Sequence, residues 1–202
     1  HRRNSTNTEL IKQRHMNKDI YIPGDSIRLR PMTEADLPLR VKWFNDPEVR
    51  KTLTVSERFE LEKTRTWFNA VQRDPSRVDL IIETQDRRPI GVIGFVHIDS
   101  VHKTAEIFLV VGEKNYWGKG VMYAAESLLM EWAFSQLGLE KIWAQADTDN
   151  VASLITMKKL GFQVEGTLRK EVIQDGRRID KLRLGLLKEE FKPVVRSEKR
   201  PL

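Results

Sequence analysis

The chain has 202 residues, of which 40% are hydrophobic, so it fits one domain with a substantial core. It has no cysteine, which excludes disulfides, thiolate metal sites and cysteine nucleophiles. No apolar run approaches the roughly 20 residues that span a bilayer, so no membrane partner is expected. The first residues are polar and basic without an apolar centre, unlike a secretory signal, so a cytoplasmic location is expected.

The formal net charge of +6 lies at the two ends of the chain. Residues 1–18 hold five Lys/Arg and one Glu, and residues 192–202 hold four Lys/Arg and one Glu. Residues 19–191 hold 26 basic and 27 acidic side chains. A nucleic-acid-binding domain carries its basic stripe on the fold itself, so no nucleic-acid partner is expected. We therefore expect one domain at 19–191, a disordered or non-native basic extension at 1–18 and a flexible basic tail at 192–202.

The N-terminal part predicts one strand and two helices. Residues 26–30 alternate between polar and apolar side chains, which is typical of a strand. Thr33 caps the helix that follows, whose first turn is acidic, and residues 45–47 (Asn-Asp-Pro) end it. A second helical pattern runs from 57 to 73.

The middle of the chain predicts three strands and the longest helix. Residues 78–83 and 90–98 are β-rich runs on either side of a polar turn, which indicates a hairpin. A third strand is expected at 105–111. A helical stripe of apolar residues then runs over 118–137, and Gly138 ends it.

The C-terminal part predicts a strand at 141–146, a short helix that Asp149 or Asn150 caps and that runs to Leu160, and two strands at 162–173 and 178–187. Asp175-Gly176 is a good hairpin turn between the last two strands. The order is strand-helix-helix-strand-strand-strand-helix-strand-helix-strand-strand. This order favours an α/β fold of the α+β type, in which a mixed sheet is flanked by helices.

The junction between strand 105–111 and helix 118–137 is a candidate anion site. Gly118 and Gly120 have no side chains to cover the backbone where the helix begins, and Lys119 adds a positive charge. The first N–H groups of a helix lack intrahelical partners and carry the positive end of its dipole, so they bind anions. A strand-to-helix turn that merely needs glycine remains the alternative, because short glycine motifs are weak evidence.

Two motifs carry a family resemblance. The first is Glu106-Ile107, then residues 111–114 (Val-Gly-Glu-Lys) and 116–120 (Tyr-Trp-Gly-Lys-Gly); the second is 150–153 (Asn-Val-Ala-Ser) and 159–162 (Lys-Leu-Gly-Phe). They resemble the motifs of the GCN5-related N-acetyltransferases (GNATs), closest to the branch of the ribosomal-protein N-terminal acetyltransferases. The resemblance covers about residues 25–190. It implies a mostly antiparallel sheet in which two central strands splay apart.

The resemblance implies acetyl-coenzyme A as co-substrate and calls for no metal. Its pantetheine arm would lie in the splay between 105–111 and 141–147, along Phe108 to Val110, with an N–H near Val110 polarising the thioester carbonyl. Asn150 would hydrogen-bond the arm, although it is also a good helix cap. The pyrophosphate would sit on the backbone N–H groups of Trp117, Gly118, Lys119, Gly120, Val121 and Met122.

Acetyl transfer to an amine needs a group that accepts the proton of the ammonium. Glu106 is the first candidate, because it begins the strand expected beside the thioester in an otherwise apolar run. Its alternative role is a structural ion pair. His97 on the preceding strand has a suitable intrinsic pKa, and a water chain is a third option. By analogy Ser153 would protonate or stabilise the departing thiolate, although it is also an ordinary helix residue.

The expected function is therefore transfer of an acetyl group from acetyl-coenzyme A to a primary amine. The acceptor could be a protein N-terminus or a small molecule such as an amino sugar, polyamine or aminoglycoside. A non-catalytic acyl-coenzyme A-binding module on the same fold is the alternative. By family analogy residues 43–54 and 173–179 would wall the acceptor side, although Trp43 and Phe44 are first of all core candidates. Many family members pair through edge strands, which leaves a homodimer open.

Overall fold

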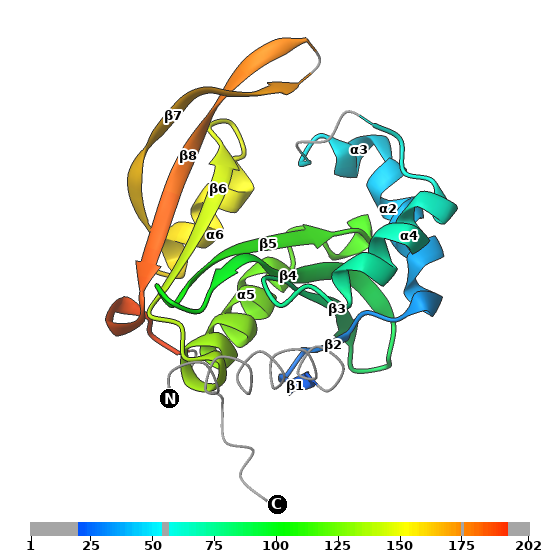
Figure 1. Cartoon of the computed structure of the whole chain (residues 1–202), viewed down its shortest axis with the longest axis horizontal. Helices are drawn as coiled ribbons and strands as arrows, with labels where there is room; N and C mark the ends of the chain where they lie inside the picture. Colours follow the sequence, from blue (N-terminus) through cyan, green and yellow to red (C-terminus); the bar gives the residue numbers. More distant parts are fainter. Residues whose placement is uncertain (1–19, 54–56, 175, 194–202) are drawn as a thin grey trace, which may run out of the picture.

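The computed structural model describes residues 20–53, 57–174 and 176–193. Eight strands of this part form one sheet in the order β1-β2-β3-β4-β5-β6-β8-β7 (Figure 1). All neighbours are antiparallel except β5 and β6, which run parallel. The predicted mixed, mostly antiparallel sheet is confirmed. The strands are β1 Ile22–Pro23, β2 Ile27–Pro31, β3 Val78–Thr84, β4 Pro89–Asp99, β5 Thr104–Val111, β6 Lys141–Asp147, β7 Gln163–Gln174 and β8 Arg177–Leu187.

The sheet splits between its two parallel strands. β5 pairs with β6 only at Thr104–Glu106. Beyond Glu106, β5 stays beside β4 up to Val111, while β6 stays beside β8 up to Asp147. Beyond Glu106, alternate residues of β5 point their N–H and C=O groups toward the gap, where no neighbouring strand forms hydrogen bonds with them. The predicted splay between these two strands is therefore present.

Helices cover both faces of the sheet and divide the core in two. One face packs on α5 and α6, with Leu80, Phe95, Leu129 and Leu186 in its core. The other packs on α2 and α4, with Trp43 among its buried residues. Figure 1 shows α2, α3 and α4 at one end of β5 and the β7–β8 hairpin beyond its other side. The helices are α2 Leu37–Asn45, α3 Pro47–Arg50, α4 Leu61–Val71, α5 Val121–Trp132 and α6 Val151–Lys159.

α4, the helix predicted over residues 57–73, begins later than the sequence pattern predicts, at Leu61 instead of Glu57. The amide of Asn45 bonds both backbone groups of Phe59, donating to its O at 2.8 Å and accepting from its N at 2.9 Å. These two bonds hold Phe59 against the end of α2, and Glu60, the N-cap of α4, has an extended backbone. Asn45 therefore ends α2 and also sets the start of α4, which local periodicity does not reveal.

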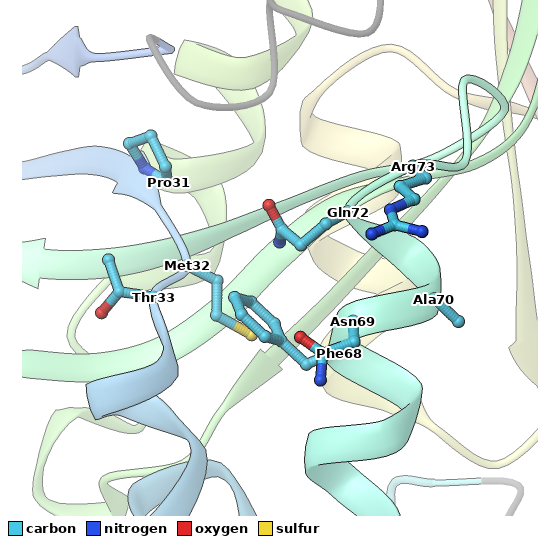
Figure 2. A pocket seen from close by; sticks show the side chains of 8 residues that line it. All are labelled: Pro31, Met32, Thr33, Phe68, Asn69, Ala70, Gln72 and Arg73. Carbon is cyan, nitrogen blue, oxygen red and sulfur yellow. The ribbon is translucent and has the colours of Figure 1, made fainter.

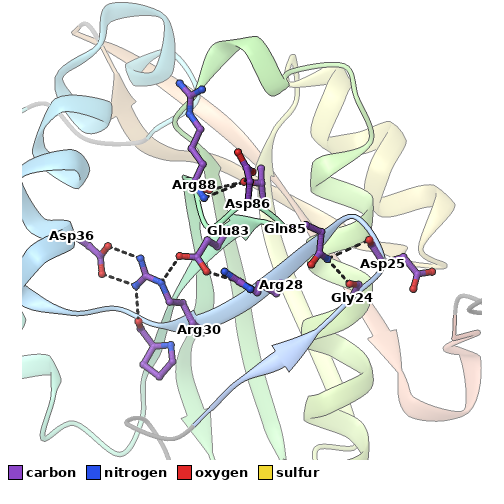
Figure 3. Close-up of polar contacts among 11 residues, drawn as sticks. Gly24, Asp25, Arg28, Arg30, Asp36, Glu83, Gln85, Asp86 and Arg88 are labelled. Atoms are coloured by element: carbon purple, nitrogen blue, oxygen red, sulfur yellow. Dashed lines mark hydrogen bonds and ion pairs between the residues drawn. The ribbon is translucent and has the colours of Figure 1, made fainter.

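A network of ion pairs fixes the start of α2 to the sheet (Figure 3). Arg30 on β2 donates two bonds of 2.8 Å to the carboxylate of Asp36 and one of 2.9 Å to Glu83. Arg28 donates to the other oxygen of Glu83 at 2.7 Å. Asp36 and Glu83 are 5% and 6% exposed, so these carboxylates depend on their partners for stabilisation.

No helix among residues 20–53, 57–174 and 176–193 is long and apolar enough to cross a membrane. The basic extension predicted at 1–18 and nearly all of the tail predicted at 192–202 lie outside the described residues.

Candidate active site

The loop after β5 presents a row of backbone N–H groups at the start of α5. Gly118 and Gly120 have φ of +72° and +77°, and Gly120 is the N-cap of α5. A Cβ on either glycine would meet no atom within 4 Å. Glycine is therefore needed for its backbone conformation, not for close packing. Open space lies beside both residues, directly at the positive end of the helix dipole.

Trp117 differs from its neighbours in this loop. Its backbone N–H already donates to the carbonyl of Lys114 at 3.0 Å, and its indole Nε1 donates to the carbonyl of Val111 at 2.8 Å. Trp117 thus ties the loop to the end of β5, and its N–H is not available to a ligand. The candidate anion donors narrow to the N–H groups of residues 118–122, with Lys119 beside them.

Trp43 fixes the same loop from the other face of the sheet. Trp43 is 2% exposed, and its ring lies against Gly112, where a Cβ would approach ring atoms to 2.1 Å. Its Nε1 donates to Glu113 at 2.8 Å. Trp43 and Phe44 are thus core residues, the first of the two roles that the sequence left open for them. Of the predicted acceptor wall, 54 and 175 lie outside the described residues.

Glu106 lies at the vertex of the splay. It is the last residue of β5 that pairs with β6, opposite Trp143, and its side chain is 17% exposed. It points to the face that carries Phe108 and Val110, because residues two apart share a face of a strand. Val110 is buried and Phe108 half-buried against the α2–α4 core. The open side of the splay is therefore lined by a carboxylate followed by apolar side chains.

His97 and Glu106, proposed from the sequence as rival bases, touch each other. His97 Nδ1 lies 2.8 Å from Glu106 Oε2. A bulge in β4 between Val96 and Asp99 brings them together, and His97 has φ of +53° there. With the proton on Nδ1, the imidazole donates to the carboxylate and leaves Nε2 as an acceptor. The structure thus forms a carboxylate–imidazole pair where the sequence offered two separate candidates.

Trp143 and Arg183 extend this pair and were missed by the sequence analysis. The Trp143 ring stacks on His97 with centroids 5.9 Å apart and planes 2° apart. The Arg183 guanidinium carbon lies 3.2 Å from the Trp143 centroid. Since β6 lies between β5 and β8, the indole stands between the imidazole and the guanidinium. Only strand register places these residues together, so no local sequence signal could have found them.

α6 begins beside the open end of β6. Asn150 caps it, accepting a bond from the N–H of Ser153 at 3.2 Å. The capping role that the sequence analysis gave as an alternative is present, and the side-chain amide of Asn150 keeps its two donors. Ser153 is half-buried, and no described residue bonds its hydroxyl. Both residues stay candidates for contacts with the pantetheine arm and its sulfur.

Comparison with known proteins identifies this arrangement. The profile of the acetyltransferase (GNAT) domain matches residues 26–163. The chain belongs to the GNAT acetyltransferase family. It is similar to the uncharacterized N-acetyltransferase p20 of Bacillus licheniformis, with 30% identity over 83% of this chain and 96% of the relative. It is also similar to the spermidine N(1)-acetyltransferase of Escherichia coli, with 26% identity over 82% of this chain and 88% of that protein.

Solved GNAT structures have the same fold. The spermidine N-acetyltransferase of Vibrio cholerae, crystallised with CoA and spermine, matches with a TM-score of 0.78 and 20% identity. The match covers 83% of this chain and 98% of that one. As a GNAT, the chain is an acyltransferase with acetyl-coenzyme A as co-substrate, as the resemblance implied. The finer assignment to the ribosomal-protein branch stays a prediction.

A separate hollow lies away from these GNAT features. It has a volume of about 810 Å³ and lies between the end of β2 and α4 (Figure 2). Its lining contains none of the predicted site residues and only one charged side chain, that of Arg73. Its lining lacks any group that could accept a proton at neutral pH, so the hollow is a weaker candidate for the chemistry than the splay. The hollow is lined by Pro31, Met32, Thr33, Phe68, Asn69, Ala70, Gln72 and Arg73.

No group of three or more His, Cys, Asp or Glu side chains in the part of the GNAT domain that the structure describes is placed to hold a metal ion.

Proposed function

We propose that this GNAT transfers the acetyl group of acetyl-coenzyme A to a primary amine at the splay between β5 and β6, with Glu106 accepting the proton of the amine. The observation that carries the proposal is the position of Glu106. It is a mostly buried carboxylate at the vertex of the splay, on the same strand that leads into the 118–122 loop. No other group named from the sequence combines these two features.

The backbone supplies the binding of the co-substrate. The N–H groups of residues 118–122 hold the pyrophosphate at the positive end of α5, and Lys119 adds charge. Within residues 108–110, Phe108 and Val110 are in register to bond β4, so the gap-facing groups of Leu109 bond the pantetheine amide as a strand would, and Asn150 donates to the same arm. An N–H near Val110 then polarises the thioester carbonyl, because a fixed donor stabilises the oxyanion as it forms.

The reaction moves one proton away from the amine and delivers one to sulfur. An amine of the lysine type has a pKa of about 10, so its ammonium must lose a proton before attack. Glu106 takes that proton directly or through water, and the bond from His97 fixes the carboxylate. The nitrogen attacks the carbonyl carbon, the new C–N bond forms and the C–S bond breaks. Ser153 stabilises or protonates the departing thiolate.

The acceptor is a primary amine of a small molecule or of a protein N-terminus. Relatives named as spermidine acetyltransferases support a small amine. The protein N-terminus, a homodimer and a cytoplasmic location rest on the sequence analysis alone.

Replacing Glu106 with glutamine tests the proposal by thiol release from acetyl-coenzyme A with a panel of amines. We expect kcat to fall by about 10²–10⁴-fold, the usual contribution of a general base. The loss should shrink as the pH approaches the amine pKa, because the neutral amine then forms without help. The affinity for coenzyme A should stay at the wild-type value. A wild-type kcat would remove Glu106 from the mechanism, and absence of thiol release from the wild type with every amine would contradict the function.

A further inference from the structure

Two carboxylates on the acceptor side of the splay, those of Glu106 and Asp147, already have a bonded side-chain partner. Glu106 bonds His97 at 2.8 Å. Asp147, at the end of β6, lies 2.7 Å from the ammonium of Lys181 on β8. Asp147 and Lys181 are only 6% and 8% exposed, so this pair is enclosed. These strands therefore offer no unpaired carboxylate to additional positive charges of an acceptor.

On β3, the same face of the sheet carries another carboxylate that is paired with a cation. Asp79 on β3 accepts two bonds from Arg77, of 2.6 and 3.0 Å. The Arg77 guanidinium carbon lies 5.4 Å from the Phe108 ring, so this pair borders the apolar floor of the splay. Arg40 lies close to the pair, between aromatic rings of α2 and α4, and is 8% exposed. Burial lowers the pKa of Arg40 to about 10, which Asp79 opposes and Arg77 reinforces, so Arg40 stays cationic at neutral pH.

Arg183 is a cation on this face without a carboxylate partner. It forms no ion pair with any residue in the described ranges, and it is half-buried. Its guanidinium lies against the Trp143 ring at 3.2 Å. In the sheet Arg183 is opposite Gln145, two residues beyond Trp143, so it shares the face of Trp143 and Glu106. The N–H groups of a guanidinium lie in its own plane, so stacking leaves them free to form a fork to an anion.

We propose that Arg183 binds an anionic group of the acceptor, a carboxylate or a phosphate, so that the preferred substrate is a primary amine that also carries an anion. This proposal rests on the proposed function, in which the amine reacts beside Glu106. Arg183 is two strands away from Glu106 and reaches back over Trp143. The amine and the anion are thus separated by one to two strand spacings, about 5–10 Å. An extended dipeptide spans about 7 Å, which fits this separation.

A polyamine fits the same surface poorly. Its extra ammonium groups would meet Arg183 and the paired carboxylates of Asp79 and Asp147. Like charges without a neutralising partner disfavour binding, particularly where the surface is partly buried. This chain is therefore expected to differ in acceptor charge from the relatives that are named for spermidine.

Matched acceptors test the proposal in the wild type. Glycylglycine and its C-terminal amide differ by one negative charge, and glucosamine 6-phosphate and glucosamine differ by a phosphate. We expect kcat/KM to be about 10–100-fold higher for the charged member of at least one pair, the size of a charge-assisted bond. The pair that discriminates identifies the anion. No discrimination in either pair, or spermidine as a better substrate than both charged acceptors, would overturn the proposal.

Variants then assign the effect to Arg183. R183Q should reduce the ratio of kcat/KM between the charged and uncharged acceptors to near one, and R183K should keep part of it. Arg73→Gln removes an exposed arginine at the end of α4 and is the control for net charge; it should keep the wild-type ratio. An unchanged ratio in R183Q, or an equal fall in Arg73→Gln, would overturn the assignment. Thermal unfolding checks that R183Q is folded.

Calorimetry separates this proposal from the proposed function, because it does not require turnover. Glycylglycine should bind the coenzyme A complex about tenfold tighter than its amide if the carboxylate is the ligand, and glucosamine 6-phosphate tighter than glucosamine if it is the phosphate. R183Q should erase the difference. Binding that follows this pattern without thiol release would contradict only the catalytic proposal. Turnover without charge discrimination would contradict only the role of Arg183.

Discussion

Replacing Gly120 with alanine changes the backbone of the glycine loop, residues 118–122, without disturbing its packing. Gly120 has φ of +77°, and a Cβ there would meet no atom within 4 Å. For alanine this left-handed conformation costs about 1–2 kcal/mol, and open space adds no steric cost. The loop can relieve the strain by rotating its peptide planes, which turns the N–H groups away from the proposed pyrophosphate site. If the whole strain is expressed in binding, affinity for acetyl-coenzyme A falls about 5–30-fold.

Gly138 provides the matched control. It has φ of +71° at the C-cap of the helical turn after α5, and a Cβ there also meets nothing within 4 Å. Gly138→Ala therefore introduces the same strain away from the loop, and its affinity in isothermal titration calorimetry should equal that of the wild type. Thermal unfolding should show a similar loss of stability. An equal loss of affinity in both variants, or none in Gly120→Ala, would refute the role of the loop.

Two buried carboxylates give pH predictions of opposite sign. Burial alone would raise the pKa of Asp36, but bonds from Arg30 and Thr33 outweigh it and hold the pKa below 3.8. Asp36 therefore stabilises the fold above that pH and loses this contribution as the pH falls. In Asp36→Asn, the free energy of unfolding, measured with urea, should therefore decrease less with falling pH than in the wild type. An unchanged decrease would contradict this. Burial raises the pKa of Glu126 from 4.5 to about 8, so its contribution to stability falls as the pH rises between these values, by at most about 5 kcal/mol. Glu126→Gln should be more stable than the wild type at pH 8, and equal or lower stability there would contradict the account.

The glycine loop could be predicted from the sequence because its cause is local. A strand, two glycines and a helix specify a turn with positive φ and free N–H groups, whatever the rest of the chain does. The hairpin between β7 and β8 followed from Asp175-Gly176 for the same reason. Trp117 shows the limit of such reasoning, since its N–H is satisfied by Lys114, a bond set by the turn before the glycines.

The set of side chains around Glu106, on the proposed catalytic face, was not predictable in this way. His97 reaches Glu106 because β4 has a bulge after Val96, and no residue pattern around His97 indicates a bulge. Trp143 and Arg183 are 40 residues apart and meet through the pairing of β6 with β8. Pairing register depends on the packing of whole strands, so it is visible only in the folded sheet.

Amide shifts in a ¹H–¹⁵N NMR titration with coenzyme A test the central claim most directly. If the helix start binds the pyrophosphate and the splay binds pantetheine, the largest changes fall on residues 118–122 and on Phe108 to Val110. The amides that line the hollow beside α4, such as Asn69, should not move. Large changes at the hollow with residues 118–122 unaffected would contradict the account.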